Sequence, residues 1–243
     1  MKDLLLLGTY HLDPDGERKI QTALEAFQPT HVFVEGHPGI VEAINSADKE
    51  FLAAIKAILK GSVLPSLINL IMQERHSLIR DITAAEDHCR RNPEVPLIYF
   101  RDVGDEAPGT MGTAARAGGQ KYLDWLRSNA IDKQRKLLQA RQRKLVDQHA
   151  QIKETWANYG NTRNERVMGD ALRAGPGRYE SIRKRDEHMW RVLSDETEPL
   201  PSVRAACIIG GAHVMETTQR TSLLDRVRSD GSFTIQRQML GLI

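Results

Sequence analysis

Two histidines and one glutamate stand at the ends of apolar segments that are far apart in the chain. His11 follows the leucine run 4–7, His213 follows the apolar run 205–209, and Glu35 ends a third apolar segment. A glycine precedes each histidine by three positions, which allows a tight turn and a close approach of substrate to the backbone. Two imidazoles and one carboxylate are a common ligand set for a divalent transition metal. A metal of this kind polarises carbonyl groups and activates water, so this pattern indicates hydrolytic chemistry.

Short apolar segments of this kind predict buried β-strands that would position the three side chains. A helix over 17–27 separates the first two strands, 3–11 and 31–36, and the simplest connection is a right-handed parallel crossover. Glu35 then leaves its strand at the same end of the sheet as His11. If the strand 204–210 lies beside the first strand, all three side chains reach the edge where open α/β sheets bind ligands.

The order of predicted elements indicates an α/β fold. We expect a mixed, mostly parallel sheet that is built from both ends of the chain and interrupted by a long helical insertion. Strands over 95–100 and 232–239 complete this sheet, and a helix over 217–228 precedes the last of them. The 243 residues would form one domain, with core segments 1–40, 93–103 and 180–243 and insertion segments of about 41–92 and 104–179.

The insertion is expected to be helical over 40–59, 62–91 and 121–157, with Ser62 as the cap of the second helix. A glycine-rich loop is predicted over 104–119, and it lacks the Lys-Ser/Thr pair of a phosphate-binding loop. The helix 121–157 repeats apolar residues every seven positions, with polar residues between them, which favours a helix lying on other elements over a coiled coil. Its basic side chains are most simply a solvated face, and the insertion helices offer a surface for a homo-oligomer.

Composition narrows the class of protein. Hydrophobic residues make up 40% and charged residues 27% of the chain, and the net charge of +2 gives no strong electrostatic argument for nucleic acid, so we expect no nucleic-acid partner. Two cysteines, Cys89 and Cys207, do not make a disulfide framework, and Cys207 falls within a predicted core strand. No signal peptide or membrane-spanning run is recognised, so we expect no membrane association and a cytoplasmic location.

Other interpretations of the same residues stay open. A histidine after a strand is often only a hydrogen-bonded structural residue, and Glu35 could cap a loop or pair with Arg101 or Arg185. His37 could be a fourth ligand or an exposed side chain before Pro38. Three further histidines in charged helical surroundings are interpreted as surface residues: His76, His88 and His149. The chain contains neither a Gly-x-Ser-x-Gly nor a His-Glu-x-x-His motif, so the corresponding hydrolase classes lack support.

Four short motifs resemble those of one known family. They are Gly8-Thr9-Tyr10-His11, Val32-Phe33-Val34-Glu35, Arg185-Asp186-x-x-Met189 and Ile208-Ile209-Gly210-Gly211-Ala212-His213-Val214. In order and rough spacing the chain resembles the TraB/PrgY/GumN group and its relatives, the Tiki proteases and the erythromycin-esterase-like and ChaN-like proteins. It departs from them at Glu35-Gly36-His37, where the usual form is Glu-Leu-Asp or similar, and the middle of the chain carries no matching motif.

This resemblance implies an α/β core with a helical insertion and a metal-dependent hydrolase site, with peptidase activity as attributed to the Tiki branch. It implies metal-binding or catalytic roles for His11, Glu35 and His213. Arg185 would bind a carboxylate or an oxyanion, and Asp186 would orient a histidine.

The sequence therefore predicts a metal-dependent hydrolase that acts on a peptide, amide or ester bond of a peptide or small-molecule substrate. Mn²⁺, Co²⁺ and Zn²⁺ all suit the donor set. Two other hypotheses remain. In one, His11 or His213 is a metal-free general base that Glu35 orients. In the other, the chain is a non-enzymatic interaction module whose helices 62–92 and 121–157 form the working surface.

Overall fold

The computed structural model describes residues 1–11, 13, 15–58, 63–77, 79–100, 108–157 and 162–240. The chain divides into two compact units, and each is described here by itself. The first, called the sheet unit below, comprises Met1–Gly36, Arg80–Asp105 and Lys153–Ile243. The second, called the helical unit, comprises His37–Ile79 and Glu106–Ile152.

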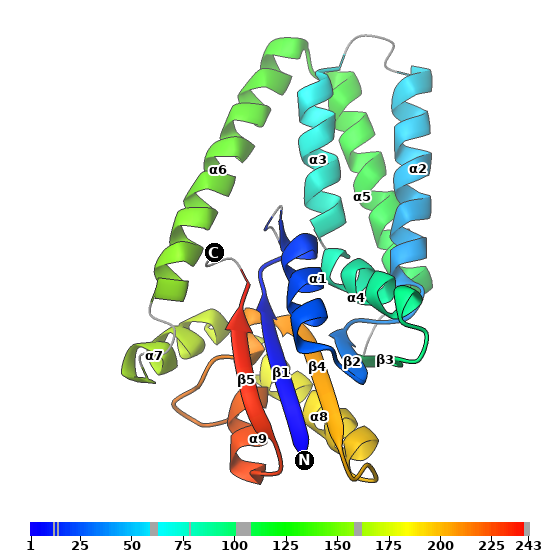
Figure 1. Cartoon of the computed structure of the whole chain (residues 1–243). Coiled ribbons are helices and arrows are strands. Elements are labelled where there is room, and N and C mark those ends of the chain that lie inside the picture. The colour runs from blue at the N-terminus through cyan, green and yellow to red at the C-terminus, as the bar shows by residue number, and fades with distance from the viewer. Residues whose placement is uncertain are drawn as a thin grey trace. The chain divides into compact units, whose positions relative to one another are not determined.

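The sheet unit contains a five-stranded parallel sheet (Figure 1). Its strands lie in the order β3-β2-β4-β1-β5, and each pairs with its neighbours in parallel. Their bounds are β1 (Lys2–Thr9), β2 (His31–Glu35), β3 (Leu97–Phe100), β4 (Val203–Gly210) and β5 (Thr234–Met239). The α/β class and a sheet built from both chain ends are therefore confirmed, and every strand pairing in the described part of the chain is parallel.

The first and fourth strands are central neighbours in this sheet. Their register runs from Lys2 opposite Val203 to Thr9 opposite Gly210, so the two strands end at the same level. Leu4, Leu6 and Leu7 are fully buried, as is Cys207 opposite Leu6. Unbroken apolar runs are typical of parallel strands because helices cover both faces of the sheet.

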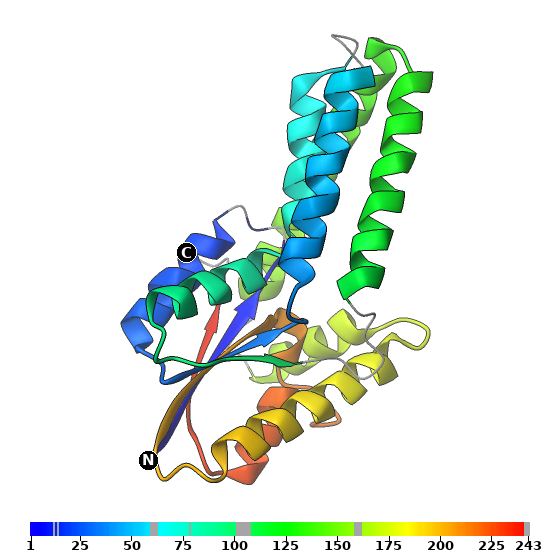
Figure 2. The same ribbon diagram turned by 90° about the vertical axis from the view of Figure 1, so that its right-hand side faces the viewer.

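Helices cover both faces of the sheet (Figures 1 and 2). On one face lie α1 (Gly16–Phe27) and α4 (Arg80–Arg91), and on the other lie α8 (Arg178–Thr197) and α9 (Leu223–Asp230). The chain that leaves β1 enters α1, whereas the chain that leaves β4 passes through the short helix η1 (Gly211–His213) toward α9 on the opposite face. Adjacent strands whose connections diverge in this way leave a crevice at their carboxyl ends, which is where open α/β sheets bind ligands.

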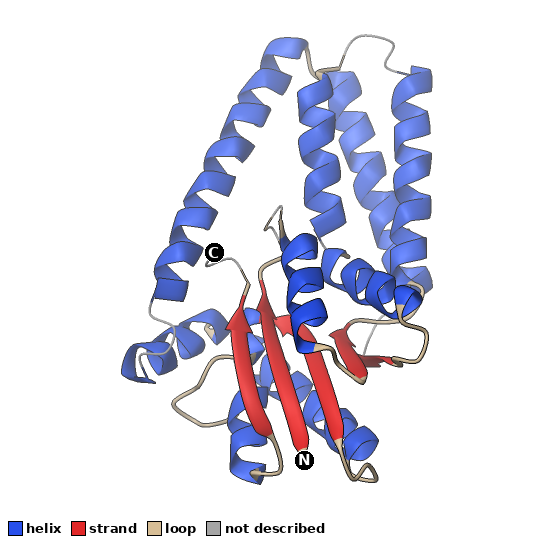
Figure 3. Cartoon of the chain, in the orientation of Figure 1, coloured by secondary structure: helices blue, strands red, loops and turns tan. Residues whose placement is uncertain are grey.

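The helical unit consists of α2 (Ile40–Ile58), α3 (Pro65–Ser77), α5 (Pro108–Ser128) and most of α6 (Ile131–Ala157). Figure 3 shows that the described parts of this unit are helices and short connections. Its core is a cluster of buried apolar side chains from α2, α3 and α5: Phe51, Leu67, Ile68, Ile71, Leu123 and Leu126. Leu137 and Leu138 of α6 pack against this cluster. Across the described ranges, none of the helices combines the length and the hydropathy needed to cross a bilayer.

Three predictions for the helices were wrong. The single helix predicted over 62–91 is two helices, α3 and α4, and its predicted cap, Ser62, lies outside the described residues. From Pro108 on, the predicted glycine-rich loop 104–119 is the first part of α5, and 104–107 lie outside the described residues. The helix predicted over 217–228 begins only at Leu223, because Ser222 and Asp225 form a capping box there.

Helix packing explains why the glycines of α5 are helical. A Cβ atom at Gly119 would lie 3.3 Å from Phe51 Cδ2, and one at Gly112 would lie 3.3 Å from the Cβ atom of Ala43. These glycines therefore allow α5 to approach α2 closely. Tertiary contact outweighs the low helix propensity of glycine here, which costs about 1 kcal/mol per residue relative to alanine.

Candidate functional site

The side chains of His11, Glu35 and His213 meet at the carboxyl edge of the sheet. Gly210 lies between them: a Cβ atom placed on it would be 3.4 Å from Glu35 Oε2, 3.6 Å from His213 Cδ2 and 4.0 Å from His11 Nε2. His11 follows β1, Glu35 ends β2, and His213 ends η1 directly after β4. The prediction that these three residues share one edge of the sheet is therefore confirmed.

His213 is held between two carboxylates. Its Nδ1 donates to Asp186 Oδ1 over 2.8 Å, and its Nε2 lies 3.6 Å from Glu35 Oε1. Burial alone would lower the pKa of this imidazole, but the charges of Glu35 and Asp186 and their hydrogen bonds raise the pKa to about 9. Without another cation at the site, His213 is an imidazolium at neutral pH.

Glu35 is ionised in this setting. Its Oε1 accepts from Arg185 Nη1 over 3.1 Å, and its Oε2 accepts from the backbone N–H of Gly210 over 2.9 Å. Although burial acts to raise the pKa of this carboxyl group, the charge and hydrogen bond of His213, the N–H of Gly210 and the charge of Arg185 hold it well below its ordinary range. Of the two pairings considered from sequence, the one with Arg185 is present, and Arg101 lies outside the described residues.

Asp186 connects His213 to a buried arginine. This carboxylate is fully buried; its Oδ1 also accepts from the backbone N–H of Leu223 over 3.0 Å, which ties it to the start of α9. Its Oδ2 lies 2.8 Å from Nη1 of Arg173, which is itself fully buried at the end of α7 (Thr162–Arg173). Arg173 Nη2 donates to the carbonyl oxygen of Ala212 over 2.8 Å. One arginine therefore neutralises Asp186 and braces the backbone next to His213.

His11 has an analogous but more open environment. Its Nδ1 lies 3.0 Å from Asp81 Oδ2 in the first turn of α4, and 49% of its side chain is exposed. The hydroxyl group of Thr9 donates to the same carboxylate oxygen. The hydrogen bond with Asp81 raises the pKa of His11, and burial opposes it. With Nδ1 engaged by Asp81, Nε2 is the ring nitrogen that faces Gly210.

Two site residues were missed by sequence reasoning. Asp81 lies in what was predicted to be the middle of a long helix, and Arg173 is one of many arginines at a helix end. Neither lies in an apolar run or a recognisable motif, so no local signal could have identified them. Arg185 was considered from sequence as a partner of Glu35, Asp186 was assigned to the site only through the motif resemblance, and both contact the predicted residues directly.

The other sequence interpretations have mixed outcomes. His37 begins the helical unit, where its Nδ1 lies 3.2 Å from the carbonyl oxygen of Pro38. His76 is half exposed, as expected, and His149 is partly buried. His88 was expected at the surface, but it is only 5% exposed because α4 packs against α1 and β2.

The chemistry of the donors suits a divalent metal ion. Carboxylates engage Nδ1 of both histidines, which leaves Nε2 of His11 and of His213 on the side of Gly210 and Glu35. Metal-binding histidines are usually oriented by such a partner. Within the described residues, no group of three or more His, Cys, Asp or Glu side chains is already gathered in a metal-ligating arrangement.

The charges at the site alternate along one row of contacts. Arg173, Asp186, His213, Glu35 and Arg185 follow one another as cation, anion, cation, anion and cation. Such a row can hold a proton at His213 Nε2, and it presents the Arg185 guanidinium, which is about one-third exposed, as a partner for negative charge.

The chain matches no protein-family model, no curated protein and no solved structure.

Proposed function

We propose that this protein is a hydrolase of a peptide, amide or ester bond and that His11, Glu35 and His213 hold a divalent metal ion for this reaction. The anchoring of both histidines supports the proposal most directly. Asp81 lies 3.0 Å from Nδ1 of His11, and Asp186 lies 2.8 Å from Nδ1 of His213. A carboxylate at Nδ1 fixes the ring orientation and the tautomer, and it makes Nε2 a stronger metal ligand.

The place of these residues in the fold gives further support. They lie at the carboxyl ends of β1, β2 and β4, and the connections after β1 and β4 run to opposite faces of the sheet. Ligands of open α/β sheets bind at such switch points, because the diverging connections leave a crevice there.

Each residue has a distinct role in this proposal. A divalent ion such as Mn²⁺, Co²⁺ or Zn²⁺ supplies Lewis acidity when bound, which polarises a carbonyl group and activates water. Arg185 binds a substrate carboxylate or the negative charge that develops on the carbonyl oxygen. Asp186 keeps the ring of His213 in one orientation, and Arg173 compensates the buried charge of Asp186.

We also propose membership of the TraB/PrgY/GumN group. The motif residues behind this resemblance lie together, since Arg185 contacts Glu35 and Asp186 contacts His213. A peptide or another small amide or ester is the proposed substrate. The free thiols of Cys89 and Cys207 agree with a reducing cytoplasm as the proposed location. Association of two copies through the helices stays a prediction, which sedimentation would test.

Metal content is the first test. Wild type, His11→Ala and His213→Ala would be loaded with Mn²⁺, Co²⁺ or Zn²⁺, desalted and analysed by mass spectrometry for bound metal. His31→Ala is the matched control, because His31 begins the strand that Glu35 ends. We expect stoichiometric metal in the wild type and the control, and its loss in the two site variants with unchanged circular dichroism. A wild type that retains no metal would contradict the metal-dependent proposal.

Gly210→Ala tests the same site without removing any of its side chains. Gly210 has φ −57° and ψ 141°, which alanine adopts without strain. The added methyl group would stand within 4.0 Å of all three proposed ligands. We expect a folded protein of nearly unchanged stability that neither retains metal nor hydrolyses peptide or ester reporters. Full metal retention by this variant would show that the ion is not bound between these residues.

A metal-free hydrolase is the second candidate, and the contacts of Glu35 favour it. Both oxygens of Glu35 already accept hydrogen bonds, from Arg185 and from Gly210, and Oε1 also faces His213 Nε2. In this mechanism His11 acts as the general base, because the raised pKa of His213 keeps that ring protonated at neutral pH, and Glu35 lies against the charged ring of His213. Hydrolysis that survives a chelator but is lost in His11→Ala would favour this candidate. Hydrolysis that a chelator abolishes and added metal restores would favour the first.

A further inference from the structure

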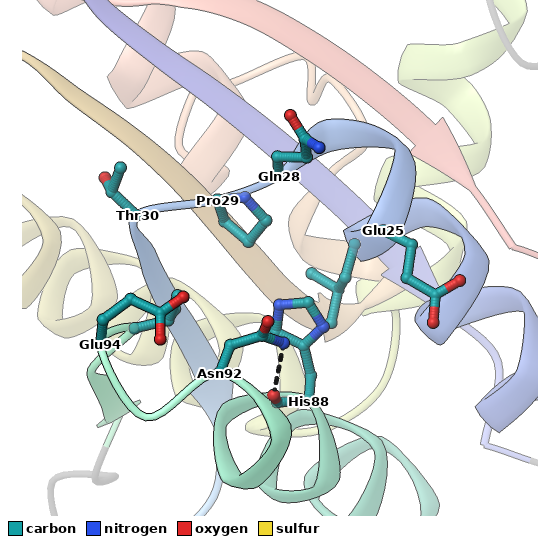
Figure 4. Close-up of a pocket in the computed structure, with 9 residues that line it drawn as sticks. Glu25, Gln28, Pro29, Thr30, His88, Asn92 and Glu94 are labelled. Carbon is teal, nitrogen blue, oxygen red and sulfur yellow. Dashed lines mark hydrogen bonds between the residues drawn. The ribbon is translucent and has the colours of Figure 1, made fainter.

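A cavity lies at the amino ends of β2 and β3 (Figure 4). It has a volume of about 500 Å³ and is bounded by the ends of α1 and α4 and by the segments that lead into β2 and β3. Leu24 and Val95 contribute apolar surface, and His88, Asn92 and Glu94 contribute polar groups. This cavity lies at the amino ends of the strands, whereas the proposed hydrolytic site lies at their carboxyl ends.

The imidazole ring of His88 lines this cavity and has a nitrogen atom without a hydrogen-bond partner among the described residues. That atom is the buried Nδ1, and the residue is only 5% exposed. Because Nδ1 is closed to solvent, Nε2 is the ring nitrogen that is left to contact a ligand in the cavity. Burial and, secondarily, Arg91 lower the pKa of His88, so the ring is neutral at pH 7 and does not repel a cation.

Two carboxylates, those of Glu25 and Glu94, line the cavity. The carboxylates of Glu25 and Glu94 lie on either side of the His88 ring in Figure 4. Arg91 Nη1 lies 3.2 Å from Glu25 Oε1, but in the described part of the chain Glu94 takes part in no ion pair. The carboxyl ends of α1 and α4 also meet at this cavity, and each adds partial negative charge, which Arg204 offsets at α1 by donating to the carbonyl oxygen of Phe27.

The amide of Asn92 is oriented so that it can accept a hydrogen bond. Its Nδ2 donates to the carbonyl oxygen of His88 over 2.9 Å, as the dashed line in Figure 4 shows. The amide oxygen therefore faces away from that carbonyl group. The amide oxygen of Asn92, the carboxylate of Glu94 and the neutral ring of His88 are therefore hydrogen-bond acceptors on three different residues. They do not form a coplanar pair of acceptors such as the two oxygens of one carboxylate. A compact ammonium group with three donors suits such a set better than a planar guanidinium.

We propose that this cavity binds a small alkylammonium ligand. The ammonium group lies near Glu94, Asn92 and His88, and the aliphatic part covers Leu24 and Val95. This inference is independent of the hydrolytic activity, because it concerns other residues at the other edge of the sheet.

Binding would be measured by NMR on protein with ¹³C- and ¹⁵N-labelled histidine, with n-butylammonium chloride as the probe. The ring signals of His88 are assigned by their absence from His88→Gln. Sodium butyrate and n-butanol carry the same alkyl chain with an anionic and a neutral head group. Glu94→Gln removes the proposed charge partner, and Glu17→Gln is the control, since it removes an equal charge from the far end of α1.

We expect saturable shifts of the His88 signals with butylammonium and much weaker shifts with butyrate and butanol. Glu94→Gln should raise the dissociation constant about threefold or more, as for one partly exposed charge contact, and Glu17→Gln should leave it unchanged. The absence of saturable shifts at millimolar probe would overturn the proposal. Equal binding of the three probes, or equal effects of the two glutamine variants, would also overturn it.

Discussion

His213 and His88 are buried to the same degree at opposite edges of one sheet, yet their pKa values shift in opposite directions. His213 is 3% and His88 is 5% exposed. The pKa of His213 rises to about 9, whereas that of His88 falls below its ordinary value. Burial lowers both, so the difference comes from the partners: two carboxylates contact His213, whereas Nδ1 of His88 has none among the described residues.

This comparison shows that the position of a histidine after a strand or on a helix does not determine its chemistry. The arrangement of charges around it does. At the carboxyl edge, Glu35 and Asp186 stabilise a charged imidazole that can hold a proton. At the amino edge, the acceptors Asn92 and Glu94 surround a neutral ring, which suits the binding of a cation.

The largest expected effect comes from removing the buried cation behind His213. Arg173→Met leaves the charge of Asp186 buried with fewer partners, and we expect a loss of about 3–5 kcal/mol in the free energy of unfolding. Urea denaturation measures this loss. Arg116→Met is the control, because Arg116 and Glu50 form an exposed pair, and it should lower the free energy of unfolding far less than Arg173→Met does. Equal losses in the two variants would mean that Arg173 does not support the site.

The second prediction concerns alkaline pH in chelator-treated protein. Because the folded-state pKa of His213 is raised from 6.5 to about 9, its stabilising contribution is complete below pH 6.5 and is lost as the pH rises to about 9. This contribution is on the order of a few kcal/mol. The difference in unfolding free energy between wild type and His213→Gln should therefore shrink over this interval. A difference that is constant with pH would contradict the raised pKa.

The third prediction is the opposite behaviour of His88. Its folded-state pKa is lowered, so the unfolded chain binds the proton more tightly, and stability is lost as the pH falls through 6.5 toward the folded-state pKa. Denaturation of wild type and His88→Gln at several values from about pH 7 to about pH 5 would measure this effect. We expect the wild type to lose more stability than the variant over this interval. Parallel pH profiles would remove the contrast between the two histidines.

The smallest expected effect is that of His11→Ala on stability. The side chain is 49% exposed, and Thr9 still donates to Asp81 after the ring is removed. We therefore expect a loss below about 1 kcal/mol, together with full loss of bound metal if the proposed site is correct. Thermal unfolding monitored by circular dichroism, followed by metal analysis of the same sample, measures both. A severely destabilised variant would indicate that His11 has a structural role.

Much of the sheet could be predicted from local patterns. The apolar runs around Leu4–Leu7 and Cys207 are typical of buried strands, and the short connection between β1 and β2 favours a parallel crossover. His11, Glu35 and His213 then share one edge if β4 lies beside β1, because parallel strands end at the same edge of a sheet. The two helices at 65–91 and the helical glycines of α5 could not be predicted, since the contacts of α4 with α1 and of Gly119 with Phe51 decide them.

The sequence by itself thus determined the fold class and the edge at which three chemically capable side chains meet, because hydrophobic periodicity and chain connectivity are local properties. Only the tertiary structure decided which charges accompany them. Asp81, Arg173 and His88 lie in ordinary charged helices of the sequence, and their importance arises from long-range packing that brings Asp81 to His11, Arg173 to Asp186 and His88 to the cavity. Electrostatic interactions depend on distance and burial in space, which local spacing along the chain does not encode.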